Sequence, residues 1–181
     1  MSGIVPSIVQ LQIYTVVQAF LATVTGLDSS LVIQGLPNRS AMPLANPGYV
    51  TMQITGGDRL NYNLDTWDPT DPDPTAIASE THWKVRMQID FYGQASGDWS
   101  TVLAGLWKDE TACLALEPVC DPLYANGPML GALDDSEAQY EARWTVEAFL
   151  QYNPVATVPM QFTTGVVGPV TLINVDEAIP P

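Results

Sequence analysis

The chain has 181 residues, 46% of them hydrophobic, which is enough for a single domain with a core of its own. Acidic residues outnumber basic ones by 20 to 6, and the formal net charge is -14. Nucleic-acid binders and proteins that attach to anionic membranes use Lys and Arg for these contacts, so the charge balance argues against direct binding to either.

The first 27 residues contain no charged side chain. They lack the basic start and the cleavage pattern of a secretory signal, and glutamines interrupt the apolar run too often for a membrane helix. We expect a soluble helix over residues 6–25, with proline in its first turn and glycine after its end. Its apolar side chains cover more than one face, which favours Phe20 and Val24 as contacts with a neighbouring subunit. A helix buried wholly within its own domain fits the same pattern.

Short strands and loops are predicted next. Residues 31–34 are apolar and predict a short strand, whereas residues 35–48 are rich in Pro, Asn and Gly and predict a long loop. Residues 49–55 alternate apolar and polar side chains, as in a strand with one buried face. Two glycines and an aspartate at 56–58 predict a turn, and residues 59–65 predict a second strand.

Residues 65–75 read DTWDPTDPDPT, an acidic segment stiffened by prolines. Clustered carboxylates suit Ca²⁺, so a calcium loop is one interpretation. The segment lacks the central glycine and the closing glutamate of an EF-hand, and proline stands where the chain would have to wrap around an ion. We therefore expect a solvated hairpin tip and name no metal ligand.

Residues 83–92 alternate most clearly and predict a strand whose polar face carries Lys84 and Arg86. A second helix is expected to begin at residue 96 or 97 and to end near Cys113.

A second long alternating strand is predicted over residues 138–152, with Arg143 and Glu147 on its polar face. If the two long strands pair, Lys84 or Arg86 could meet Glu147 or Glu141. Two separate solvated faces are the alternative. The interface candidates from the sequence are Arg86, Arg143, Lys84, Glu147, Phe20 and Val24.

No repeat or long linker divides the chain. Residues 114–128 are rich in proline and predict irregular structure, and residues 160–175 contain two short β-prone runs. We predict an α+β single domain, a mainly antiparallel β-sheet packed by two α-helices. Residues 1–153 would form its body and residues 154–181 a C-terminal β-prone arm or hairpin of the same domain.

Support for catalysis is weak. The chain has one histidine, His82, and none of the glycine-rich loops that hold phosphates. The spacing of Cys113 and Cys120 is wrong for a metal signature, and we expect free thiols, although a bridge between them is the alternative. Acidic residues are abundant, so a hydrolase with two carboxylates stays open. We predict no enzyme and no cofactor.

Seven short segments resemble one protein family in their order and spacing. They are QGLPNR at 34–39, AMP at 41–43, YVTM at 49–52, QIDFYG at 88–93, DPLYA at 121–125, QYEARW at 139–144 and QYNP at 151–154. The family is that of the tail terminator proteins in the neck of tailed bacteriophages. The resemblance spans nearly the whole chain, and the acidic insert at 65–74 is longer than the family pattern leads us to expect.

The resemblance implies a structural virion protein, made in the host bacterial cytoplasm and placed at the head–tail junction. It implies a homo-hexamer that caps the tail tube protein, stops its polymerisation and joins the head-completion or connector protein, with sheath or tail-side neck proteins as further partners. DNA would pass through the ring, and an acidic wall would repel its phosphates. The alternatives are another neck component, such as a head-completion or stopper protein, a small acidic hydrolase, and a monomeric binding module.

Overall fold

The computed structural model describes residues 4–35, 46–66, 76–134 and 140–159. The helices within these ranges are α1 (Gln10–Thr25), α2 (Ser96–Leu106) and α3 (Glu110–Leu116), with a short 3-10 turn, η1 (Ser29–Leu31). The strands are β1 (Val32–Gln34), β2 (Tyr49–Arg59), β3 (Leu64–Thr66), β4 (Ala76–Glu80), β5 (Trp83–Tyr92), β6 (Asp121–Ala125), β7 (Met129–Asp134), β8 (Tyr140–Tyr152) and β9 (Val155–Pro159).

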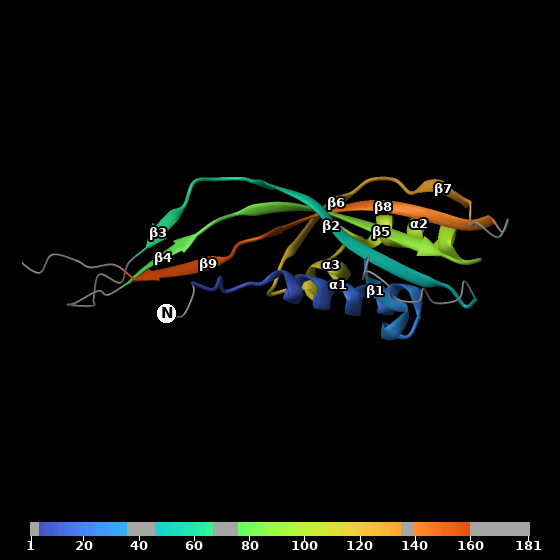
Figure 1. Ribbon diagram of the computed structural model, residues 1–181, viewed down its shortest axis with the longest axis horizontal. Helices are drawn as coiled ribbons and strands as arrows, with labels where there is room; N and C mark the ends of the chain where they lie inside the picture. The colour runs from blue at the N-terminus through green and yellow to red at the C-terminus, as the bar shows by residue number, and fades with distance from the viewer. Residues whose placement is uncertain (1–3, 36–45, 67–75, 135–139, 160–181) are drawn as a thin grey trace, which may run out of the picture.

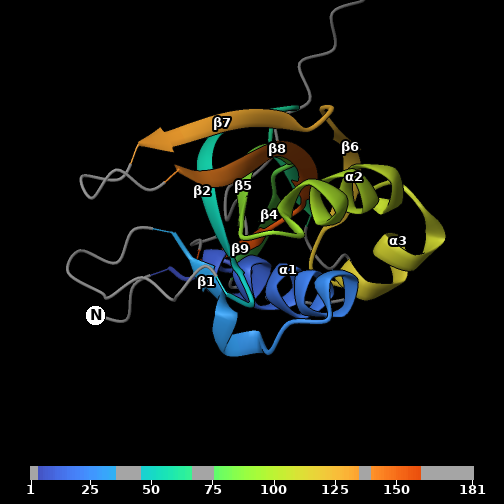
Figure 2. The same ribbon diagram turned by 90° about the vertical axis from the view of Figure 1, so that its right-hand side faces the viewer.

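The main sheet has the strand order β1-β2-β5-β8-β6, and β7 also pairs with β8. Apart from the parallel pair β1–β2, its strands are antiparallel. The three helices pack on one side of this sheet (Figure 2). The predicted α+β class with a mainly antiparallel sheet is therefore confirmed.

The core lies between the helices and the inner face of the main sheet. Alternate residues of β5 point into it, because successive side chains of a strand face opposite ways. From the helices, Val17, Leu21 and Leu103 are fully buried. The inner-face residues of β5 and β8 in the core are Val85, Met87, Ile89, Phe91, Val146, Ala148 and Leu150.

A second sheet, β3-β4-β9, continues three strands of the main sheet beyond the body. Strand β3 follows β2, β4 precedes β5 and β9 follows β8, so the order is kept across the junction. Backbone hydrogen bonds join the two sheets there, from Leu60 N to His82 O (2.8 Å) and from Thr81 N to Pro154 O (3.1 Å). Figure 1 shows the three strands projecting from the end of the helical body. We call this sheet the β-arm.

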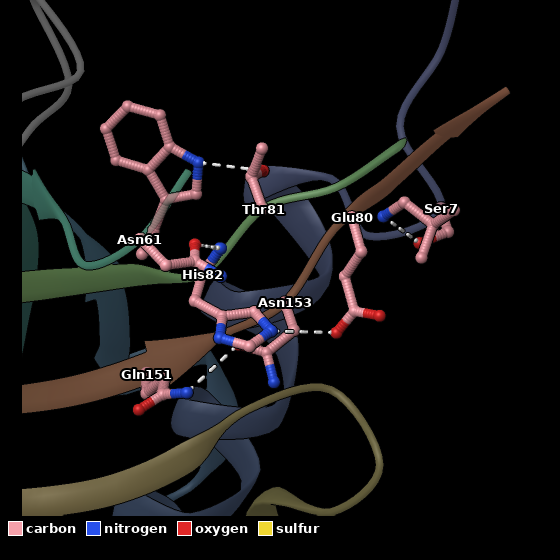
Figure 3. Close-up of polar contacts among 9 residues, drawn as sticks. Ser7, Asn61, Glu80, Thr81, His82, Gln151 and Asn153 are labelled. Atoms are coloured by element: carbon pink, nitrogen blue, oxygen red, sulfur yellow. Dashed lines mark hydrogen bonds and ion pairs between the residues drawn. The ribbon is translucent and has the colours of Figure 1, made fainter. Parts of the chain in front are cut away.

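Polar side chains fasten the junction between the β-arm and the body (Figure 3). Asn61 Oδ1 accepts a hydrogen bond from His82 N at 3.0 Å. The N-terminal segment lies along β9, where Ser7 Oγ accepts from Val155 N at 2.9 Å and Ser7 N donates to Val155 O at 2.8 Å. The chain ahead of α1 is thus tied to the arm.

The helices differ from the sequence predictions at two points. The first begins at Gln10 rather than at residue 6, because residues 6 and 7 pair with β9 instead, and Gln12 Oε1 accepts the Val9 N–H at the helix start. The expected second helix is two helices, because Asp109 takes an extended conformation and α3 begins after it, at Glu110.

Several strands were missed or misplaced. The turn predicted at 56–58 is wrong: β2 runs straight through, with a β-bulge between Ile54 and Gly56. Glycine fits a bulge as readily as a turn. The segment 114–128, predicted as irregular, contains β6, and β4, β7 and β9 were not predicted as strands. Most of the acidic segment 65–75, and the β-prone runs at 160–175, lie outside the described residues.

Candidate subunit interface

Four predicted interface residues lie on one surface, the face of the main sheet opposite the helices, which we call the outer face. Lys84 and Arg86 come from β5, and Arg143 and Glu147 come from β8. The alternation that buries their neighbours in the core turns these side chains the other way. The sequence pattern therefore placed them correctly on a common face.

The two long strands pair as predicted, but among the described side chains neither Lys84 nor Arg86 forms the suggested contact with Glu147. In the antiparallel register, Arg86 lies opposite Phe149 and Glu147 lies opposite Gln88. Glu147 instead accepts a hydrogen bond from Asn126 Nδ2 at 3.0 Å. The predicted ion pair of Arg86 or Lys84 with Glu147 is therefore wrong, because the register sets the positions two residues apart.

Asp90 is the centre of a polar network that the sequence did not identify. It is 7% exposed, and its Oδ2 accepts from Arg143 Nη2 at 2.9 Å and from Gln88 Nε2 at 2.9 Å. Its Oδ1 accepts from Thr145 Oγ1 at 2.6 Å. The hydrogen bond to Asp90 raises the pKa of Arg143, with burial acting in the opposite direction. Arg143 thus makes an ion pair from β8 to β5 within one subunit.

A pocket of about 300 Å³ opens on the outer face beside the β-bulge. Lys84 Nζ lies 3.5 Å from Asp58 Oδ2 and 5.9 Å from the centre of the Phe149 ring. Arg86 Nε donates to Thr55 Oγ1 at 3.1 Å. The pocket is lined by Gly56, Gly57, Asp58, Lys84, Arg86 and Phe149. In the sequence, the feature that indicated this pocket was the glycine pair at 56 and 57, which we interpreted as a turn.

The two candidates from α1 have different environments. Phe20 is 2% exposed, and its ring lies 6.2 Å from the Trp107 ring in a tilted arrangement. A side chain so deep in the subunit has no surface to offer a neighbour, so Phe20 is a core residue. Val24 is half-buried and packs against the core. The breadth of the apolar pattern on α1 therefore reflects, at Phe20, burial within the domain.

The sequence matches, over residues 11–177, the profile of the family described as Phage neck terminator protein. The chain belongs to this family. The resemblance drawn from the seven short segments is therefore confirmed. None of the curated proteins compared with the chain matches it.

Membership of the phage neck terminator family gives the chain a structural role in the tail and neck of a phage particle, in contact with tail and head components. Among the described residues, no helix has the length and apolar character needed to cross a membrane. Over the same ranges, no cluster of three or more His, Cys, Asp or Glu side chains could hold a metal ion.

His82 of this neck terminator pairs with an acidic side chain, which the sequence analysis did not anticipate. Its Nε2 lies 3.0 Å from Glu80 Oε1 (Figure 3). The two residues are two positions apart, so they share a face of the strand path. Ser79, on the alternate position, has a buried hydroxyl with no hydrogen-bond partner in the described part of the chain. Within the described residues, no Ser, Thr or Cys side chain hydrogen-bonds to either member of the pair, so the geometry supports a structural contact at the junction.

The two cysteines are free thiols, as expected, and they should differ in reactivity. Burial, with a smaller contribution from Asp121, raises the pKa of Cys120 to about 12, whereas Cys113 is exposed. Since only the thiolate reacts, alkylation of the folded protein at pH 8 should modify Cys113 alone. Mass spectrometry should show one label per native chain and two after denaturation. Rapid double labelling of the native protein would contradict the buried position of Cys120.

Proposed function

We propose that the chain forms a hexameric ring at the end of the phage tail tube, where it stops tube polymerisation and joins the tail to the head connector. The observation that carries this proposal is the family match over nearly the whole chain. Further partners would be tail-side neck or sheath proteins. The protein would be made in the host bacterial cytoplasm, would act without a cofactor and would not be an enzyme.

The charge of the chain supports the passage of DNA through the ring. A net charge of -14 per copy repels phosphate, so DNA could slide past without binding. The same charge opposes contact between copies, which favours assembly on the tube end as a template. In solution, the free protein is then expected to be a monomer at moderate concentration.

The outer face of the main sheet is the surface that we propose for contact between copies. Lys84 and Arg86 lie on it and have no core function, and Glu147 lies on the same face. Arg143 acts inside the subunit through Asp90, and Phe20 through the core. Val24 stays a candidate through its half-exposed side chain.

The C-terminal residues are proposed to contact a partner ring. Residues 1–153 would be the body of the domain, but β9 at 155–159 pairs with β4 and holds Ser7, so the arm depends on it. A chain truncated after residue 159 keeps β9 and should fold. We expect a phage that carries this truncated chain to make filled heads and tails that do not join, as scored by electron microscopy of infected-cell lysates.

Deletion of the gene tests the function. Heads should fill normally, because filling needs a packaging motor that this chain does not resemble, and tails should be unattached or irregular in length. The full chain supplied from a plasmid should restore plaque formation. Empty heads in the mutant would place the protein on the portal side, as a stopper or head-completion protein.

A neck reconstruction by electron microscopy should show six copies, and another symmetry would contradict the ring proposed here.

A further inference from the structure

The pocket on the outer face has a chemistry unlike the rest of this acidic chain. It brings together two of the six basic residues, Lys84 and Arg86, with one carboxylate, Asp58, and one aromatic ring, Phe149. Asp58 is mostly in solvent, with a side chain 77% exposed, and its one ion pair within the described ranges is with Lys84. The pocket therefore carries an excess positive charge beside an aromatic wall.

We propose that this pocket binds the aspartate-rich segment 65–75 of a second copy of the chain, and so links neighbouring copies head to tail. The proposal rests on the ring proposed above and adds to it which surfaces meet. The second copy is favoured by charge complementarity, because the segment has four aspartates and no basic residue.

Arg86 is the group in the pocket that is free to take a carboxylate. Its side chain is exposed, and its hydrogen bond in the structure is to the neutral hydroxyl of Thr55. Among the described residues, no acidic side chain lies within ion-pair distance of it. A guanidinium presents a planar fork of donors that matches a carboxylate with two parallel hydrogen bonds.

The glycines and the aromatic wall suit the second feature of the segment, its three Asp-Pro pairs. Gly56 and Gly57 carry no side chain, so backbone and ring atoms of a bound segment can approach the bulge closely. Phe149 stacks on Tyr124 with ring centres 4.4 Å apart, which extends the apolar surface beside the cations. The proline ring of an Asp-Pro pair could pack on this aromatic surface while the neighbouring aspartate carboxylate binds Arg86.

Geometry favours a neighbouring copy over the chain's own segment. The segment leaves β3 at Thr66 and returns at Ala76, on the β-arm beyond the body (Figure 1). From Ala78, the partner of Thr66, to Lys84 the strand path is six residues, or roughly 20 Å. A loop of nine residues with both ends at the arm reaches roughly 15 Å at its midpoint. An arm reaching across to the next copy makes a heterologous contact, the kind that closes rings.

Charge reversal tests the proposal in the phage itself. Arg86→Glu and, separately, Asp71→Arg should each lower the plaque titre at least about tenfold, because each replaces an attraction between copies with a repulsion. A tenfold weaker contact corresponds to about 1.4 kcal/mol. The double variant should recover most of the titre, because the pair is restored between copies with its signs exchanged. Lys108→Glu is the matched control, since it makes the same change of net charge at an exposed site beyond α2 and should leave the titre unchanged.

A disulfide distinguishes a neighbour's segment from the chain's own. Phages carrying Thr55→Cys with Asp71→Cys, in a Cys113→Ser background, are oxidised and their neck protein is run on a non-reducing gel. Covalent dimers and higher oligomers are expected, and Thr55→Cys alone should give none. A monomer in which the two new cysteines form a disulfide with each other would mean that each chain fills its own pocket, which overturns the proposal. An intact neck ring without disulfides would overturn it too, whereas particles with no ring of this chain would overturn the proposed function instead.

Discussion

Replacing Trp107 with alanine is expected to destabilise the subunit by about 3–5 kcal/mol, the range for large aromatic side chains removed from a core. Trp107 is 0% exposed and lies where α2 ends, between the helices and the sheet. Its indole Nε1 donates to Phe149 O at 3.0 Å, and its ring packs against Phe20. Alanine would leave a cavity and a carbonyl without its donor.

Urea unfolding followed by circular dichroism measures this loss. The whole domain is expected to be stable by about 5–15 kcal/mol, so the variant should unfold at much lower denaturant. Trp107→Phe keeps an aromatic ring at this position, so its free energy of unfolding should fall between those of the wild type and Trp107→Ala. Tyr62→Ala is the exposed control: the Tyr62 side chain is 93% in solvent, and its removal should change stability by less than about 0.5 kcal/mol. A loss below about 1 kcal/mol in Trp107→Ala would contradict the packing described for this side chain.

The two long strands were predicted almost to the residue because their pattern is long. Strand β5 spans Trp83–Tyr92 as predicted, and β8 begins two residues later than predicted and ends at the same place. Alternation over ten or more residues leaves few other interpretations. The same alternation assigned the outer-face side chains to their surface. The sequence could therefore predict which residues lie on the candidate interface, because that depends only on the two-residue repeat of a strand.

The short strand β1 was predicted, but β4, β6, β7 and β9 were not, because partner strands rather than their own sequences hold them in place. Strand β4 is five residues long and pairs with β3 on one side and β9 on the other. Strand β6 contains Pro122, which usually argues against a strand, but it lies on an edge where a missing N–H is tolerated. The β-arm therefore follows from the pairing of the whole sheet and not from any local pattern.

Contacts that depend on register were also beyond the sequence. The polar face of β5 was known, but the residue of β8 that stands beside Arg86 depends on the register, and a shift of two residues would be needed to bring Glu147 opposite it. The pocket depends in addition on the bulge in β2, which only the pairing with β5 reveals. For Phe20, an apolar helix surface does not by itself say whether a subunit or its neighbour covers it.

The second large effect is expected at the partly buried ion pair of Arg143 and Asp90 on the outer face. Arg143→Glu should destabilise the subunit by about 3–5 kcal/mol, the range for breaking a buried pair, because it sets a second carboxylate beside Asp90. Arg143→Met removes the cation but keeps the packing of its stem, and about 2–3 kcal/mol is expected because the arginine is about a third exposed. Thr145 and Gln88 would still donate to Asp90 in that variant.

The pH dependence of the pair follows from the raised pKa of Arg143. A cation whose pKa is higher in the folded state adds stability that is complete below its usual value and is lost only as the pH rises through the raised one. The contribution of the arginine is thus present over the whole neutral range, and ordinary buffers do not remove its charge. Mutation, rather than titration of Arg143, is therefore the way to break the pair.

A double-mutant cycle separates the pair from the rest of the network. Asp90→Asn, Arg143→Met and the double variant are compared by urea unfolding of the monomer, and the double variant should lose about 1–3 kcal/mol less than the sum of the singles. Additive losses would mean that the two side chains do not interact. Because the pair lies within one subunit, Arg143→Glu should lower the phage titre by unfolding the chain. A variant that is as stable as the wild type but fails to assemble would instead place Arg143 in the contact between copies.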